Sequence, residues 1–200
     1  IRTNYALFWA FRCFWLNMKS ENAIIHFMNT KILTVNEYDP EPEVIREAAQ
    51  VLKDGGLVAF PTETVYGLGG DGLNPEASGK IYAAKGRPSD NPLILHIAER
   101  EELIPLTAEI PQMAERLMDT FWPGPMTLIF RKSEQVPYET TGGLDTVAVR
   151  MPSHPVARRL IQEAGLPIAA PSANLSGRPS PTSASHVEED LNARIDMILD

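Results

Sequence analysis

Hydrophobic residues recur along residues 31–200 in two alternating patterns, short apolar runs and longer amphipathic stretches. Short runs that are rich in Val, Ile and Leu and bounded by Gly, Pro or Asn are typical of buried β-strands. They occupy residues 31–35, 57–62, 92–98, 126–132, 146–152, 166–174 and 194–200. Apolar residues spaced three and four apart, which is typical of one helix face, occupy residues 39–56, 74–86, 110–124, 154–165 and 183–192.

The alternation of these patterns determines the expected fold class. Strands that alternate with helices through short connections favour an α/β domain built around one open sheet. Several helices also carry end signals, such as Asn74-Pro75 at the start and Gly86 at the end of one stretch. The chain shows no internal repeat, low-complexity tract or interdomain linker, and its 200 residues suit one domain.

Residues 1–27 differ from the rest of the chain. They do not begin with Met, they are rich in Phe and Trp, and Arg12 interrupts an apolar run that is too short to span a membrane. We expect an extension outside the fold, with the native start at Met28 or Met18, and a domain over residues 28–200. An amphipathic targeting or interface helix is the alternative. The chain also stops on an apolar strand, which suggests that the domain is truncated at its C-terminal end.

Composition narrows the possible classes of function. A hydrophobic fraction of 44% excludes disorder of the whole chain, and a net charge of -8 argues against a surface that coats nucleic acid. The single cysteine, Cys13, excludes a disulfide framework and a cysteine-rich zinc site. This cysteine usage agrees with a reducing, cytoplasmic location.

Three polar loops are expected to follow strands, where α/β sheets place their sites. The first covers residues 61–72, where Thr62 and Thr64 flank Glu63 and several glycines would allow a ligand to approach the backbone closely. It is not a phosphate-binding loop of the Walker A type, because no Gly-Lys-Ser/Thr follows. A turn that caps the next helix is the alternative interpretation.

The second loop contains Lys85, Arg87 and Asn91. The helix dipole alone could explain Lys85, but Pro88 should turn Arg87 away from the helix. Two cations and an amide suit a polyphosphate. His96 lies in the apolar strand that follows, which by itself is more typical of a core histidine.

The third loop, residues 169–182, contains small residues that we expect not to pack a core, together with hydroxyls, an amide and Arg178. Before it, Arg150 ends a strand and could pair with a carboxylate, or lie in water at a sheet edge. No nucleophile with an evident base appears, and the histidines lack metal-ligand spacing. Such a site would hold phosphates and a small polar molecule by positioning and charge.

Five motifs in this order resemble the YrdC/Sua5 family, the L-threonylcarbamoyladenylate synthases. They are FPTETVYGLG, KGRPSDNPL, WPGPMTLI, VAVRMP and PSANLSGRPSPT. The resemblance implies a twisted, open, mixed α/β sheet flanked by helices, with a concave, positively charged cavity. It also implies an enzyme, a nucleotidyltransferase that converts L-threonine, bicarbonate and ATP into threonylcarbamoyl-AMP and diphosphate. Other proteins would then transfer the threonylcarbamoyl group to adenosine 37 of tRNA.

The resemblance also implies roles for particular residues. The catalytic group would be Lys85, Arg87, Ser172 and Asn174. Contacts to ATP would come from Arg87, Asn91, Thr146, Ser172 and Ser180, and contacts to threonine from Thr64, His96, Arg150 and the backbone near Ala170. Mg²⁺ would accompany the polyphosphate, without a dedicated carboxylate site. The alternatives are a module that binds tRNA or double-stranded RNA without catalysis, the similar domain of hydrogenase-maturation carbamoyltransferases, and a catalytically inactive piece of a larger assembly.

Overall fold

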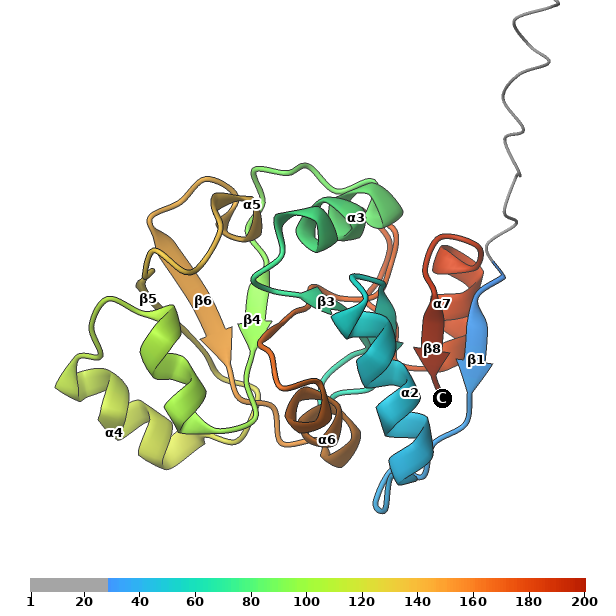
Figure 1. Cartoon of the computed structure of the whole chain (residues 1–200), viewed down its shortest axis with the longest axis horizontal. Coiled ribbons are helices and arrows are strands. Elements are labelled where there is room, and N and C mark those ends of the chain that lie inside the picture. Colours follow the sequence, from blue (N-terminus) through green and yellow to red (C-terminus); the bar gives the residue numbers. More distant parts are fainter. Residues whose placement is uncertain (1–28) are drawn as a thin grey trace, which may run out of the picture.

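The computed structural model describes residues 29–200 (Figure 1), so the expected extension over residues 1–27 lies outside the described residues. Its strands are β1 (Lys31–Leu33), β2 (Val58–Phe60), β3 (Gly67–Asp71), β4 (Ile94–His96), β5 (Thr127–Arg131), β6 (Thr146–Arg150), β7 (Ile168–Ala169) and β8 (Met197–Leu199). Its helices are α2 (Pro42–Lys53), α3 (Pro75–Lys85), η1 (Arg100–Leu106), α4 (Gln112–Phe121), α5 (Tyr138–Thr141), α6 (Pro155–Ala164) and α7 (Ala184–Leu191).

All eight of these strands form one mixed sheet, in the order β1-β8-β2-β3-β7-β4-β6-β5. The pairs β1–β8, β2–β8 and β4–β6 are parallel, and the pairs β2–β3, β3–β7, β4–β7 and β5–β6 are antiparallel. The single mixed α/β sheet expected from the alternation of strands and helices is therefore confirmed.

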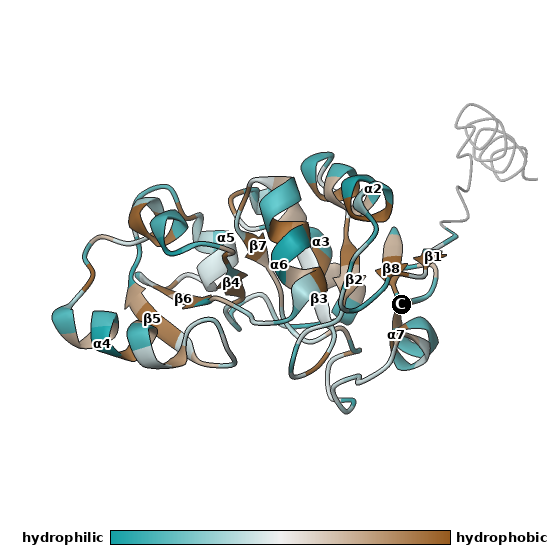
Figure 2. Cartoon of the chain, turned by 90° about the horizontal axis from the view of Figure 1, so that it is seen from below, coloured by the Kyte–Doolittle hydropathy of each residue, from teal (hydrophilic) through white to brown (hydrophobic). Residues whose placement is uncertain are grey.

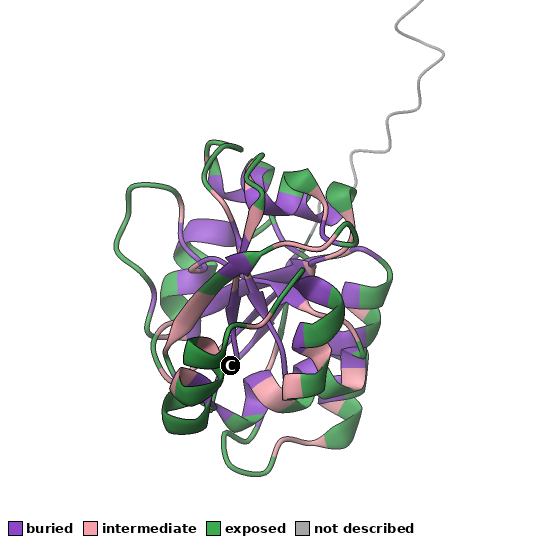
Figure 3. Ribbon diagram, turned by 90° about the vertical axis from the view of Figure 1, so that its left-hand side faces the viewer, coloured by how far each residue is buried: buried purple, intermediate pink, exposed green. Residues whose placement is uncertain are grey.

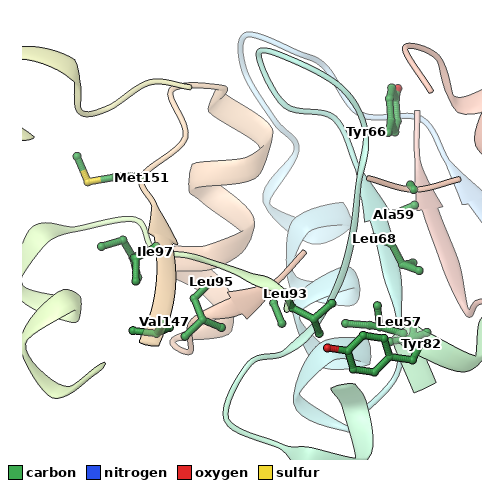
Figure 4. Close-up of a cluster of buried hydrophobic side chains, with 14 of the residues drawn as sticks. Leu57, Ala59, Tyr66, Leu68, Tyr82, Leu93, Leu95, Ile97, Val147 and Met151 are labelled. Atoms are coloured by element: carbon green, nitrogen blue, oxygen red, sulfur yellow. The ribbon is translucent and has the colours of Figure 1, made fainter. Parts of the chain in front are cut away.

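Both faces of the sheet are covered, so the central strands are buried (Figure 3). Along β2, Val58 and Phe60 pack with α2 and α6, whereas Ala59 packs in the cluster that contains α3 and α7. Alternate residues of a strand point to opposite faces, so these helix pairs lie on opposite sides of the sheet. Figure 4 shows part of the hydrophobic cluster that contains Ala59, including Leu95 and Val147. Figure 2 shows hydrophilic and hydrophobic residues alternating along α2 and α4.

The prediction of a first polar loop over residues 61–72 is partly wrong, because residues Gly67–Asp71 form the buried strand β3. An added Cβ at Gly69 would lie 2.8 Å from Phe60 Cε1 and 2.9 Å from Ile168 Cγ2. These glycines therefore make room for side chains of the neighbouring strands rather than for a ligand. The polar connection is limited to residues 61–66.

The third loop was also interpreted wrongly in one respect. Ala169, Ala170 and Ala173 are all buried and belong to the two hydrophobic clusters, so small residues do pack here. The short helices η1 and α5 were not expected; η1 includes Pro105, and α5 is only four residues long. Within residues 29–200, no helix has the length and apolar character needed to cross a membrane.

Candidate active site

The expected site residues fall into two groups at opposite ends of the paired strands β4 and β6. Ile94 pairs with Ala148 and His96 pairs with Arg150, so Thr146 lies toward the start of β4 and Arg150 at its end. At about 3.3 Å per residue, Thr146 and Arg150 are about 13 Å apart along β6. Arg87 and Asn91 precede β4 and lie with Thr146 toward the first end, in a first group around Lys85. His96 and Arg150 lie at the second end and form a second group with Thr64, which Arg150 contacts.

Lys85 is the centre of the first group. It is the last residue of α3 and is only 2% exposed, and its ammonium donates to the carbonyl oxygens of Ser172 and of Asn174, the latter at 2.6 Å. Ser172 is in turn held against the sheet by a bridge to Gly67. Lys85 therefore joins the end of α3 to the loop that follows β7, which brings the two expected catalytic segments together.

The surroundings of Lys85 disfavour its charge. Burial, followed by the nearby charge of Arg87, lowers the pKa of Lys85 to about 8, while Asp190 opposes the shift. The Arg87 guanidinium folds back on its own loop and donates to the carbonyl oxygens of Asn91 at 3.3 Å and Pro92 at 3.1 Å. Burial also lowers the pKa of Arg87. Within residues 29–200 neither of these adjacent cations forms an ion pair, so both are suited to an anionic ligand.

The loop that follows β7 is held from its other side by Asp190 of α7. This buried carboxylate accepts from the backbone N–H of Leu175 at 2.9 Å and from Arg178 Nη1 at 2.5 Å. The side-chain amide of Asn174 donates to the carbonyl oxygens of Leu175 and Arg178, both at 2.8 Å. Asn174 Oδ1 is buried without a hydrogen-bond partner among the described residues. The loop is thus fixed while one acceptor of Asn174 remains available.

Arg150 is the centre of the second group. It is 9% exposed, so the interpretation as an edge-strand arginine in water is wrong. Its Nη2 donates to Thr64 Oγ1 at 3.1 Å and lies 2.9 Å from Glu63 Oε1. The connection after β2 and the end of β6 therefore meet through this guanidinium.

His96 lies beside Arg150 in the sheet and is buried. Its ring packs edge-on against Phe60, with centroids 6.4 Å apart, and its Nδ1 is 3.2 Å from the carbonyl oxygen of Ile94. Burial, together with the charge of Arg150, lowers the pKa of His96 to about 4. The imidazole is therefore neutral at pH 7, which suits a hydrogen-bonding contact rather than an ion pair.

A cavity of about 540 Å³ opens beside Thr64. Its lining includes Glu37, Glu63, Thr64, His154 and Asp200, so acidic side chains predominate around this hollow. Three of these residues carry carboxylates, although the charge of Glu63 is balanced by Arg150.

A second hollow, of about 280 Å³, contains Arg178 and Ser180. Thr182 lines both hollows, so they adjoin at this residue. Between the two groups, the backbone N–H of Ala170 is used in the sheet, where it donates to the carbonyl oxygen of Ile94 at 2.9 Å. In residues 29–200, no cluster of three or more His, Cys, Asp or Glu side chains could hold a metal ion.

Two residues at the site were missing from the expected set, Glu63 and Asp190. Glu63 was noted only as the residue between two threonines, but a charged residue in a short loop that follows a buried strand is a usable signal, and Glu63 lies two residues after Pro61. Asp190 lies three residues after Val187 and one before Leu191, which places it on the buried face of its helix. Helical spacing could therefore have identified it.

The sequence of the chain also matches a known protein family. Residues 50–200 match the family model Sua5/YciO/YrdC, described as "Telomere recombination". This match covers more than half of the chain, and the fold is the single twisted mixed sheet described above. The chain therefore belongs to the Sua5/YciO/YrdC family.

Two curated relatives carry the name threonylcarbamoyl-AMP synthase. The protein of Pyrococcus abyssi is 58% identical over 171 residues, which are 86% of this chain and 50% of the relative. That of Bacillus subtilis is 57% identical over 163 residues, 81% of this chain and 46% of the relative. The solved structure of P. abyssi Sua5 complexed with L-threonine superposes with a TM-score of 0.84, at 58% identity, over 86% of this chain and 50% of that one. The chain thus spans about half the length of these relatives.

Proposed function

We propose that this protein is a threonylcarbamoyl-AMP synthase, which joins L-threonine, bicarbonate and ATP. The observation that carries the proposal is the joining of Lys85 to the backbone of Ser172 and Asn174, next to Arg87. This arrangement provides cations and free polar groups around one loop, as a polyphosphate requires. The relatives named threonylcarbamoyl-AMP synthase support the same activity.

The reaction would proceed in two steps. The amine nitrogen of threonine attacks the carbon of bicarbonate, water leaves, and a carbamate forms. A carbamate oxygen then attacks the α-phosphorus of ATP, the bond between the α-phosphorus and the bridging oxygen breaks, and diphosphate leaves. Negative charge develops on the departing phosphates, where Lys85 and Arg87 would stabilise it. This is nucleotidyl transfer, so the class of enzyme is a nucleotidyltransferase.

The second group would bind the amino acid. The guanidinium of Arg150 would bind the carboxylate of threonine, and Thr64 and neutral His96 would form hydrogen bonds with threonine. Asn91, Thr146 and Ser180 would complete the contacts to ATP, and Mg²⁺ would arrive with the polyphosphate. The product would pass to proteins that modify tRNA.

Release of diphosphate from ATP tests the proposal. With bicarbonate present, release should depend on L-threonine and should yield threonylcarbamoyl-AMP by mass spectrometry. L-Serine, which lacks only the methyl group, should be used about 10–200-fold less efficiently. Release that is independent of threonine, or no release at all, would contradict the proposal. Binding of tRNA without ATP, weakening steeply with salt, would then favour an RNA-binding module.

A further inference from the structure

The ion pair between Glu63 and Arg150 lies where the amino-acid site is proposed. Its two charged atoms are 2.9 Å apart, and the side chains are only 19% and 11% exposed. The same nitrogen of Arg150 also donates to Thr64 Oγ1. Glu63 and Thr64 both line the cavity of about 540 Å³, so a small molecule could reach this point.

Two polar atoms of this pair are left without a hydrogen bond. Glu63 Oε2 and Arg150 Nε are buried and have no hydrogen-bond partner among residues 29–200, whereas Glu63 Oε1 is engaged by Arg150 Nη2 in the ion pair. Buried polar groups without partners are costly and rare, so a cluster of them requires an explanation. A bound molecule with both a donor and an acceptor could satisfy this free acceptor and this free donor next to the cavity.

The charge of the pair limits what that molecule can be. Burial raises the pKa of Glu63, but Arg150 and nearby backbone N–H groups together outweigh burial and leave the pKa below its ordinary value. Glu63 is therefore a carboxylate at neutral pH and the pair has no net charge. A simple anion or a simple cation would leave one charge uncompensated in a partly buried site. A zwitterion adds one charge of each sign and keeps the pair neutral, and its ammonium group also suits the carboxylates of Glu37 and Asp200 that line the cavity.

We propose that Glu63 accepts the amino group of the amino-acid substrate and makes this site selective for a zwitterion. Arg150 Nε–H would donate to the substrate carboxylate, while a carboxylate oxygen of Glu63 would accept from the ammonium group. The inference rests on the proposed function for the identity of the amino acid. Glu63 thus determines specificity for the amino group, a role separate from the phosphate-binding group around Lys85.

The test compares two ligands on the whole chain and on its Glu63→Gln variant. L-Threonine and 3-hydroxybutanoate differ only by the amino group, and calorimetry gives the affinity of each. A hydrogen bond to a charged group contributes about 1.5–3 kcal/mol, which corresponds to about 10–100-fold in affinity. We therefore expect the preference for threonine over 3-hydroxybutanoate to fall by about 10–100-fold in Glu63→Gln. Gln keeps the size of Glu and an acceptor for Arg150.

Glu99→Gln is the matched control, because Glu99 also pairs with an arginine, Arg158, at 3.3 Å, but its side chain is 52% exposed. It should leave the preference unchanged. An equal loss of affinity for both ligands in Glu63→Gln would show a merely structural role and overturn the inference. An unchanged preference for L-threonine over 3-hydroxybutanoate in Glu63→Gln would also overturn the inference. Failure of the wild-type protein to bind L-threonine would overturn it as well.

Diphosphate release by the wild-type protein is measured separately, so the two proposals can fail independently. Threonine binding that depends on Glu63, without turnover, would support the inference and contradict the synthase activity. Turnover with an unchanged ligand preference in Glu63→Gln would support the activity and overturn the inference.

Discussion

The ammonium of Lys85 donates to the carbonyl oxygen of Asn174 at 2.6 Å, and this contact joins residues 89 positions apart in the chain. Lys85 also donates to the carbonyl oxygen of Ser172, and it is buried. Its position at the end of α3 is therefore fixed by its hydrogen bonds to the loop that follows β7. Lys85 supplies charge to the proposed phosphate site and at the same time orders the backbone there.

Replacing Lys85 with Met should remove the charge but keep an unbranched side chain. We expect kcat for diphosphate release to fall by at least about 100-fold, as when one preorganised donor is removed from other active sites. Lys53→Met is the matched control, because Lys53 donates to the carbonyl oxygen of Glu163 at 2.9 Å but is exposed. Steady-state kinetics on both variants check this, and near-normal kcat in Lys85→Met would contradict it.

His96 should make stability depend on pH in the acidic range. Its pKa is about 4 in the folded protein and 6.5 ordinarily, so between these values the unfolded chain binds a proton that the folded chain does not. The free energy of unfolding should therefore fall as pH drops through this window, by up to about 1.4 kcal/mol per pH unit. Urea unfolding of wild type and His96→Leu from pH 7 to pH 4 measures this. Equal slopes in the two proteins would show that His96 does not contribute.

Asp190 should matter for both stability and ATP binding. Asp190→Ala leaves the Leu175 N–H and Arg178 without their shared acceptor, and we expect a loss of about 1–3 kcal/mol in the free energy of unfolding. The loop around Asn174 should also loosen, so that KM for ATP rises. Glu189→Ala serves as control, because Glu189 is the next residue, lies 3.7 Å from Arg178 and is 74% exposed. It should change stability by less than about 0.5 kcal/mol. Similar behaviour of the two variants would contradict the role of Asp190.

Gly69 should not tolerate a side chain. In Gly69→Ala the new Cβ would clash with Phe60 and Ile168, and we expect a loss of about 1–3 kcal/mol in the free energy of unfolding. Gly79 lies inside α3 with no atom within 4 Å of an added Cβ, so Gly79→Ala should instead gain about 0.5–1 kcal/mol. Thermal unfolding of the two variants should move in opposite directions. A stabilised Gly69→Ala would show that β3 is not packed as described.

The sheet and its helices could be predicted because their hydrophobic patterns are strong and local. The failure at Gly67–Asp71 has a physical reason, since a glycine-rich strand is formed by the shape of its neighbours, Phe60 and Ile168, rather than by its own side chains. The burial of Ala169 and Ala173 has the same origin. Tertiary packing decides these segments, and no short-range pattern carries that information.

The site was predicted unevenly for a similar reason. Lys85, Ser172 and Asn174 were predicted as site residues from sequence motifs, and the structure brings them together. The pairing of Arg150 with Glu63 joins residues 87 positions apart in the sequence. The spacing of residues in the sequence could not decide whether Arg150 is buried or exposed. Burial and pairing follow from the sheet register, which becomes known only with the fold.

The parallel pairing of β1 with β8 has a consequence for synthesis of the protein on the ribosome. Within residues 29–200, β1 pairs with no strand other than β8, and β8 also separates β1 from β2. Residues 31–33 must therefore wait until residues 197–199 have left the ribosome before they can join the sheet. Among the strands of residues 29–200, the first to emerge is the last to find its neighbour, so closure of this half of the sheet is a late, long-range event.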